Sequence, residues 1–421
     1  MKKILWAMTA LLGIAACTTI DNDIPAPPRK QLTEAQMDSL YADSIMKLST
    51  YTVLQSHSSG DGFHIIIMGD GFTSNDISNG KYRAAVQKAK DAIFEQEPMK
   101  SLQGYVDVIE VAVPSTHDGV DYTKRRTGLR TSLSSGNDSN VYGDSIAILN
   151  CACKALINAY QINSNAELTR RINKSLIITL LNTNIYKGVT LLAADESATD
   201  GTPNGYSLSY VPAYATVNNI DVMPYLIRHE GVGHGIAKLA DEYYYASKGI
   251  PQSSVITQYQ ESKNYGFYQN TTYRNNATTT NQTFSIEYSS WLYPFSQRSE
   301  YANSDVQWYA GAFEYSTGFC RFGDFSIMNA TLRADNPSYD PKTGTFNVAS
   351  RAMIYKRIMK AANSSWQWSV NDFIYFDSPA RASYATSNAR GVKAIPSTVI
   401  TNAPALAAPK LIKMDLPKAG L

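Results

Sequence analysis

The sequence predicts an α/β fold in which helices cover a mostly parallel sheet. The main observation is that short, almost wholly apolar segments alternate with helical patterns between residues 60 and 182. The chain has 421 residues, of which 44% are hydrophobic and 18% are charged. This composition supports a sizeable core and excludes a disordered protein, and the length suits one large domain or two modest ones.

The predicted elements follow in order. A helix at residues 33–48 begins with the capping-box pair Thr33 and Gln36. A short strand at 64–68 ends at Gly69-Asp70-Gly71, and a helix at 74–94 follows. The remaining elements are a strand at 105–113, a helix at 142–160, a strand at 175–182 and a last helix at 347–362.

The composition changes after residue 243. From there to about residue 319 the chain is rich in Tyr, Asn, Gln, Ser and Thr and has little periodicity. We expect an insertion at about 246–310, which is either a substrate-contacting subdomain or a long surface insertion. Residues 363–421 form a C-terminal extension, and beyond residue 377 they are rich in Ala, Ser and Pro and should pack loosely.

The first residues have the pattern of a targeting signal. Lys2 and Lys3 precede an apolar run, residues 4–16, which is too short to span a bilayer and predicts a signal peptide. The run ends in Ala-Ala-Cys17, which resembles the lipobox of bacterial lipoproteins; an ordinary signal with a chance cysteine is the alternative. Residues 17–59 would then be a tether and the first helix. We expect a chain anchored by lipid on Cys17 in the bacterial cell envelope, with the outer membrane as the favoured site.

Charge and cysteine content exclude several classes of protein. Without Lys2 and Lys3, basic and acidic residues both number 36, so the chain lacks the basic footprint of a nucleic-acid-binding protein. Cys151, Cys153 and Cys320 are too few for a disulfide scaffold. One bridge to Cys320 and buried free thiols both remain open.

The chemistry concentrates at His229-Glu230-Gly231-Val232-Gly233-His234, which contains two of only five histidines. In the His-Glu-x-x-His motif two imidazoles one helical turn apart hold zinc, and the glutamate takes a proton from water. Here one more residue separates the histidines. On a regular helix they would diverge by about 140°. A π-type bulge would realign them, and two glycines, which cost about 1 kcal/mol each in a helix, favour such a distortion.

This segment, followed by Leu239-Ala240-Asp241-Glu242-Tyr243, resembles the active-site signature of the M64 peptidases, the IgA-peptidase family of zinc metalloendopeptidases. The family has two residues between the histidines, so the third is a departure. Shorter motifs in the same order extend the resemblance over about residues 60–362: 67–73, 97–98, 113–115, 119–121, 311–315, 320–321 and 326–328. The resemblance implies a three-layer, zincin-like sandwich with an active-site helix and a less regular C-terminal subdomain.

The resemblance also assigns roles. His229 and His234 would be ligands of one zinc ion, and Glu230 would be the general base. Asp241 is the favoured third ligand, because a catalytic zinc needs three protein ligands; Glu242 is the second choice, and an acidic pair that only caps the helix is the third. The run 236–240 reads as helical, which opposes ligation by Asp241. Met328 is either a methionine turn beneath the metal or a core residue.

Other polar residues carry weaker signals. Asp70 stands at the carboxyl end of the first strand, where α/β sheets place ligand sites, but an Asp-Gly turn explains it as well. His117 lies in a loop, where a surface histidine is the default. The expected activity is endopeptidase action on protein or peptide substrates. The alternatives are an inactive relative that binds protein or glycan, and a zinc enzyme that cuts cell-wall peptides.

Overall fold

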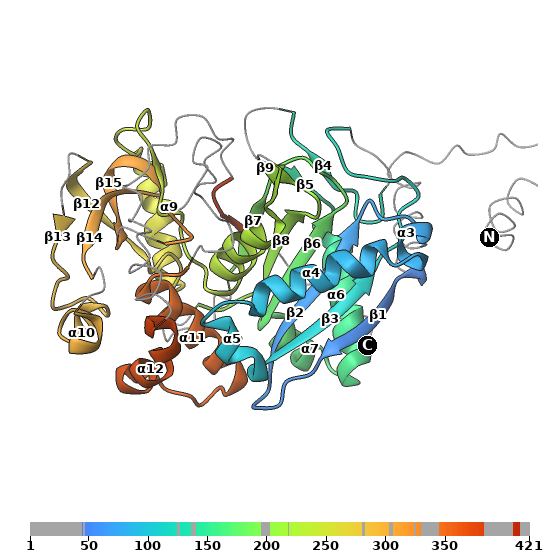
Figure 1. Ribbon diagram of the computed structural model, residues 1–421, viewed down its shortest axis with the longest axis horizontal. Coiled ribbons are helices and arrows are strands. Elements are labelled where there is room, and N and C mark those ends of the chain that lie inside the picture. The colour runs from blue at the N-terminus through green and yellow to red at the C-terminus, as the bar shows by residue number, and fades with distance from the viewer. Residues whose placement is uncertain are drawn as a thin grey trace, which may run out of the picture. The chain divides into compact units, whose positions relative to one another are not determined.

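A seven-stranded sheet forms the centre of the computed structural model, which describes residues 44, 47–123, 127–135, 140–194, 203–217, 219–279, 283–302, 306–323, 326–329, 345–382 and 407–412 (Figure 1). The expected signal peptide, Cys17 and nearly all of the helix at 33–48 lie outside these residues. The strands lie in the order β1 (Thr50–Gln55), β3 (Val106–Ala112), β2 (Phe63–Asp70), β6 (Ser175–Leu181), β8 (Ser207–Pro212), β7 (Val189–Ala193) and β16 (Lys410–Ile412).

The four inner strands, β3, β2, β6 and β8, are parallel, as the sequence predicts. They are buried along their whole length, and most of their residues are apolar, although β3 also contains Asp107 and Glu110. Two antiparallel strands flank them, because β1 pairs with β3 and β7 pairs with β8. The short strand β16 pairs with the outer edge of β7 in the parallel direction.

Helices cover both faces of this sheet, which gives the expected three layers (Figure 1). On one face lie α3 (Ser74–Ser78), α4 (Lys81–Phe94), α8 (Met223–Leu226) and the π-helix η2 (Ile227–Ile236). On the other face, α6 (Ser145–Tyr160) packs against β3 and against α7 (Asn165–Ile172). The single helix predicted at 74–94 is wrong, because Gly80 has a φ of 87° and breaks it into α3 and α4.

The Tyr- and Asn-rich stretch contributes to a second sheet. This sheet contains β11 (Tyr244–Tyr245), β15 (Glu314–Phe322), β14 (Trp308–Ala312), β13 (Thr283–Phe284) and β12 (Thr271–Thr278). Aromatic rings of Tyr259, Phe313 and Phe319 pack edge to face between it and α9 (Ser253–Asn264). The predicted last helix is confirmed as α11 (Val348–Ala362), which Asn347 caps through the amide of Ser350.

Short elements complete the described chain. They are α5 (Met99–Leu102), α10 (Tyr293–Ser296), α12 (Val370–Phe376), the 3₁₀ turns Gln103–Tyr105 and Ser299–Tyr301, and two small hairpins. The hairpins pair β4 (Ser132–Leu133) with β5 (Val141–Tyr142), and β9 (Thr216–Val217) with β10 (Ile220–Asp221). All three described cysteines are buried free thiols. Among the described helices, none has the length and apolar character that crossing a membrane requires.

The Asp-Gly turn after β2 has a structural explanation. The buried carboxylate of Asp70 accepts hydrogen bonds from the hydroxyl groups of Ser115, Thr127 and Thr131 and from the amides of Leu129 and Thr131. These donors come from a segment about 45 to 60 residues further along the chain. Asp70 therefore fixes that segment against the carboxyl end of the sheet, and its oxygens are fully engaged.

Candidate metal centre

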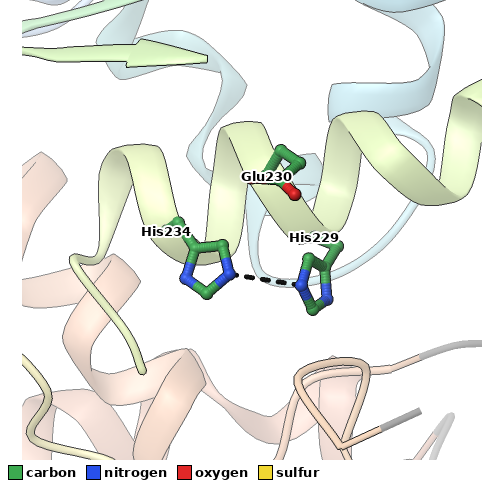
Figure 2. Close-up of side chains that lie close together, drawn as sticks. All are labelled: His229, Glu230 and His234. Carbon is green, nitrogen blue, oxygen red and sulfur yellow. Dashed lines mark hydrogen bonds between the residues drawn. The ribbon is translucent and has the colours of Figure 1, made fainter. Parts of the chain in front are cut away.

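The π-helix η2 resolves the unusual spacing of the two histidines. In a π-helix the backbone hydrogen bond joins residues five apart, so residues five apart return to the same face. His229 and His234 are five apart, and Figure 2 shows both imidazoles projecting from one side of the helix. The sequence suggested a single bulge, whereas the π conformation extends over ten residues. All ten are buried against β6, β7, β8, α4 and α11.

Two glycines of η2 let the helix approach its neighbours closely. A Cβ atom on Gly233 would lie 2.3 Å from Sδ of Met328, and one on Gly235 would lie 2.4 Å from Cδ1 of Leu176. Met328 thus packs directly beneath the segment that separates the histidines. It also belongs to the main hydrophobic core, as the core interpretation predicts, and the methionine turn beneath a metal stays a prediction.

The chain leaves η2 at Ala237, so the predicted helix at 236–240 is wrong. Lys238 adopts a left-handed conformation, with a φ of 55°, and its buried ammonium donates to the carbonyl of Tyr206 at 2.7 Å. Asn270 then holds Ala240 through both backbone groups: its Oδ1 accepts from the amide at 2.9 Å, and its Nδ2 donates to the carbonyl at 2.8 Å. This turn folds the next residue, Asp241, back toward the histidines.

Three ligand-type atoms therefore converge. Nε2 of His229 and Nε2 of His234 are 3.2 Å apart, and Oδ1 of Asp241 lies 3.2 Å from the first and 3.3 Å from the second. In a tetrahedral zinc site with bonds of about 2.0–2.1 Å, neighbouring ligand atoms are about 3.3 Å apart. The triangle matches three corners of such a tetrahedron, and the fourth corner is left for water or substrate.

The hydrogen bonds of the rings fix which nitrogens are available. Nδ1 of His229 donates to the carbonyl of Ile327 at 3.1 Å, and Nδ1 of His234 donates to the carbonyl of Leu239 at 2.8 Å. A carbonyl oxygen only accepts, so both Nδ1 atoms carry hydrogen and both Nε2 atoms can present a lone pair. Within the described residues, neither buried carboxylate oxygen of Asp241 accepts a hydrogen bond. Three lone pairs this close repel one another, so a cation, either a proton or a metal ion, would stabilise the triangle.

The pKa values of His234 and Asp241 in the metal-free protein also favour a positive charge between these residues. Burial acts to lower the pKa of His234, but the nearby charges of Asp241 and Glu230 and the contacts with Asp241 and the Leu239 carbonyl together outweigh it and raise that pKa to about 9. Burial likewise acts to raise the pKa of Asp241, and the charges and contacts of His234 and His229 together lower it instead, to about 2. Without a metal ion, one proton therefore remains in the centre of the triangle at neutral pH.

Glu230 lies beside this triangle and is held on one side only. Its Oε2 accepts a hydrogen bond from the hydroxyl of Thr190 on β7 at 2.7 Å, whereas its buried Oε1 has no partner among the described residues. The hydroxyl of Ser209 donates to the Glu230 carbonyl at 3.1 Å and fixes the backbone. Burial raises the pKa of the Glu230 carboxyl, which suits a group that gains and loses a proton.

Two carboxylates could supply the third ligand from distance alone. Ligand atoms of His229, Glu230 and His234 lie within 4.8 Å of one another (Figure 2). Asp241 lies 3.2 and 3.3 Å from the two imidazoles, and neither of its oxygens accepts a hydrogen bond from another described residue. This position fits the third ligand that the sequence favours, and the roles of Asp241 and Glu230 stay predictions.

Glu242 does not point into the centre. Its carboxylate accepts hydrogen bonds from Nδ2 of Asn270 at 2.9 Å and from Nδ2 of Asn347 at 3.0 Å, and burial raises its pKa to about 7. The second-choice ligand is thus engaged in joining β12 to the start of α11. The capping alternative is also wrong for Asp241, because that residue lies after a turn and faces both imidazoles.

The remaining histidines lie elsewhere. His117 is exposed in a loop and contacts the hydroxyl of Thr116. His57 and His64 share the carboxylate of Asp107 near the amino ends of β2 and β3, at 2.8 and 3.1 Å. No local sequence pattern points to Thr190, Ile327 or Asn270, because their contacts with the centre depend on tertiary structure.

A family comparison agrees with this geometry. The family model described as IgA Peptidase M64 matches residues 52–283, more than half of the chain, including η2 and Asp241. No curated protein matches the chain. Peptidases of this family are metallopeptidases, which fits a centre built from two imidazoles and a carboxylate. The chain therefore belongs to the M64 family of peptidases, as the motifs around His229 and Asp241 indicate.

Proposed function

We propose that the chain is a zinc-dependent endopeptidase that hydrolyses protein substrates outside the cytoplasm. The observation that carries this proposal is the triangle of His229, His234 and Asp241. Its edges of 3.2–3.3 Å fit one small tetrahedral ion, and its carboxylate has no hydrogen-bond partner elsewhere among the described residues. Two imidazoles with one carboxylate form a donor set typical of catalytic zinc, whereas magnesium and calcium prefer oxygen alone.

The residues around the centre divide the chemical work. Zinc, when bound, supplies a Lewis acid that polarises a peptide carbonyl and acidifies water toward a pKa of about 7. Glu230 accepts the proton of the attacking water at Oε1, which faces no hydrogen-bond donor among the described residues. Thr190 holds the other oxygen, so the carboxylate keeps one orientation while Oε1 passes the proton to the leaving amine. No nucleophilic side chain is needed.

We further propose that the protein is held at the cell envelope by lipid on Cys17. The support is the sequence of residues 1–17 alone: two lysines, an apolar run and Ala-Ala-Cys. Such an anchor would present the peptidase to proteins outside the cytoplasm. Mass spectrometry of the protein from its native membrane, compared with a Cys17→Ala variant, tests this part separately from the peptidase activity.

The extra residue between the histidines is the main argument for an inactive relative. This argument is weak, because η2 brings both imidazoles to one side and Glu230 is present. An enzyme that cuts cell-wall peptides uses the same centre and differs only in substrate. Digestion of unfolded casein against digestion of purified cell-wall peptide distinguishes the two.

The decisive experiment measures metal and activity together on a version of the chain that starts at Thr18. Elemental mass spectrometry should find about one zinc per chain in the parent and in Glu230→Gln, but none in His234→Ala. Casein hydrolysis should occur only in the parent. Absence of zinc from the parent after incubation with the metal and dialysis would refute the proposal. Hydrolysis that survives in Glu230→Gln would refute the role of Glu230.

A further inference from the structure

The outer edge of the central sheet is occupied by the chain's own C-terminal segment. Residues 410–412 form β16, which pairs with Leu191, Leu192 and Ala193 of β7, far from it in sequence. In Figure 1 this short red segment lies beside β7. Just before it, the amide of Ala407 points to the carbonyl of Gly188 at 3.4 Å. We call residues 407–412 the strap.

The strand beneath the strap is directly attached to the reaction centre. Thr190 of β7 donates a hydrogen bond to the Glu230 carboxylate at 2.7 Å. A Cβ atom on Gly188 would lie only 3.1 Å from Oε1 of Glu230, so the backbone there touches the proposed base. Any extended chain that pairs with β7 from Gly188 onward therefore passes beside Glu230. The strap pairs with this stretch of β7.

We propose that the strap occupies the position in which an extended peptide substrate pairs with β7, so that the C-terminal segment is a built-in competitor of substrate. This inference rests on the proposed peptidase function. An exposed sheet edge binds extended peptides through backbone hydrogen bonds, largely independently of their side chains. β7 already pairs with β8 on its inner edge, so the edge under the strap is the one left for a peptide.

The strap is held by a small set of contacts. The hydroxyl of Tyr268 approaches the Pro409 carbonyl at 3.5 Å, and the ammonium of Lys410 contacts the side chain of Asn140. Leu411 packs against the buried cluster that contains Leu192 and Tyr268. Three paired residues and one half-buried leucine are few enough to be displaced. A competitor bound about 90% of the time lowers the apparent affinity for substrate about tenfold.

A reversible lock tests the proposal in the full chain. Leu191 and Lys410 are cross-strand partners, and neighbouring strands lie about 4.8 Å apart, within the span of a disulfide. The double variant Leu191→Cys/Lys410→Cys should lose casein binding and hydrolysis when oxidised, and regain both with a phosphine reductant that leaves zinc in place. Leu191→Cys alone is the control. The three thiols among the described residues are buried, which raises their pKa values to about 11 or 12 and slows competing oxidation.

Release of the strap is the complementary test. Leu411→Asp places a charge against the buried cluster and should lower KM about tenfold with little change in kcat. Ile146→Asp, which adds the same charge at an exposed position on α6, should change neither. An oxidised lock that still hydrolyses casein at the parent rate would overturn the proposal. So would a Leu411→Asp variant with an unchanged or higher KM.

A measurement of casein binding tests this inference separately from the proposed activity. Fluorescein-labelled casein is titrated into zinc-loaded Glu230→Gln carrying the lock, in oxidised and reduced forms. Tighter binding by the reduced form supports the strap as a competitor even if the parent hydrolyses nothing, in which case only the peptidase proposal fails. Equal binding by the two forms refutes the strap while leaving the peptidase proposal intact.

Discussion

Asp241 is the residue whose surroundings most clearly demand a cation. Its carboxylate is buried, faces two imidazole nitrogens at 3.2 and 3.3 Å, and accepts no hydrogen bond within the described chain. Its neighbour Glu242 is equally buried but accepts hydrogen bonds from two asparagine amides. Under the proposed function, these two adjacent acids have different tasks: Asp241 binds the metal, and Glu242 stabilises the fold.

Asp241→Asn should therefore weaken zinc binding strongly, while Glu242→Gln should not. Loss of a residue that merely orients a ligand typically costs about 10–100-fold in metal affinity, so loss of a ligand should exceed about 100-fold. Competition with a chromophoric chelator measures both affinities. Glu242→Gln should stay within about threefold of the parent and instead lose thermal stability. The reverse pattern would assign Glu242 as the ligand.

The affinity for zinc should also depend on pH in a defined direction. His234 must lose its proton to bind metal, and its pKa in the metal-free protein is raised to about 9. Below that pH a proton competes with zinc, so each unit of rising pH between 7 and 9 should tighten binding about tenfold. Above about pH 9 the dependence should flatten. Titrations in chelator-buffered zinc check this, and an affinity that is constant from pH 7 to 9 would contradict it.

Thr190 should matter for turnover without affecting the metal. Its hydroxyl holds one oxygen of Glu230 at 2.7 Å, and a hydrogen bond to a charged group contributes about 1.5–3 kcal/mol. Thr190→Val keeps the shape and removes this donor, so kcat should fall about 10–100-fold with zinc content unchanged. Thr190→Ser keeps the hydroxyl and should retain most of the activity. Equal losses in both variants would indicate a packing role instead.

At the scale of the element, η2 should tolerate an added methyl group at Gly231 but not at Gly233. A Cβ atom on Gly231 would meet Cδ1 of Ile178 at 3.5 Å, an ordinary contact, whereas one on Gly233 would meet Met328 at 2.3 Å. Gly233→Ala should lower the unfolding free energy by about 1–3 kcal/mol and disturb the metal centre. Gly231→Ala is the matched control and should be neutral or slightly stabilising. Thermal unfolding and zinc content of the two variants measure this, and equal effects would contradict the packing argument.

Local sequence was sufficient to predict those elements that are determined by their own residues. The inner strands β2 and β6 are mostly apolar runs and β3 alternates as a strand does, and the His-Glu spacing with its glycines pointed to a π distortion. It was insufficient where distant contacts override local preference. Residues 236–240 have helical propensity, but two tertiary contacts end the helix. The buried Nζ of Lys238 donates a hydrogen bond to the Tyr206 carbonyl, and the side chain of Asn270 binds both backbone groups of Ala240. β16 has too few residues to carry a periodic signal, and its partner is far away in sequence.

At the scale of the whole molecule, the residues around the candidate metal centre come from segments that belong to two different sheets. η2 packs on the central sheet, while Asp241 leads into β11 of the second sheet. Two backbone carbonyls orient the imidazoles: that of Ile327, from beyond the second sheet, and that of Leu239, from the turn after η2. Glu242 and its asparagine partners lie at the same junction. A cation in the triangle therefore stabilises the junction as well as the site.

Removal of zinc should consequently lower the thermal stability of the whole described unit. Zinc at about 1,000 times its dissociation constant stabilises the native state by about 4 kcal/mol, which corresponds to a loss of roughly 10 °C in Tm on removal. Scanning calorimetry of the parent with and without chelator measures the shift, and His234→Ala, which lacks zinc in both conditions, should show none. Hydrogen exchange should accelerate most at residues 237–243 and 326–329, because the triangle and the Ile327 carbonyl tie these segments to η2. An unchanged Tm after verified loss of metal would mean that the junction is preorganised by Asn270, Asn347 and Met328 alone. The centre would then serve chemistry without contributing to the fold.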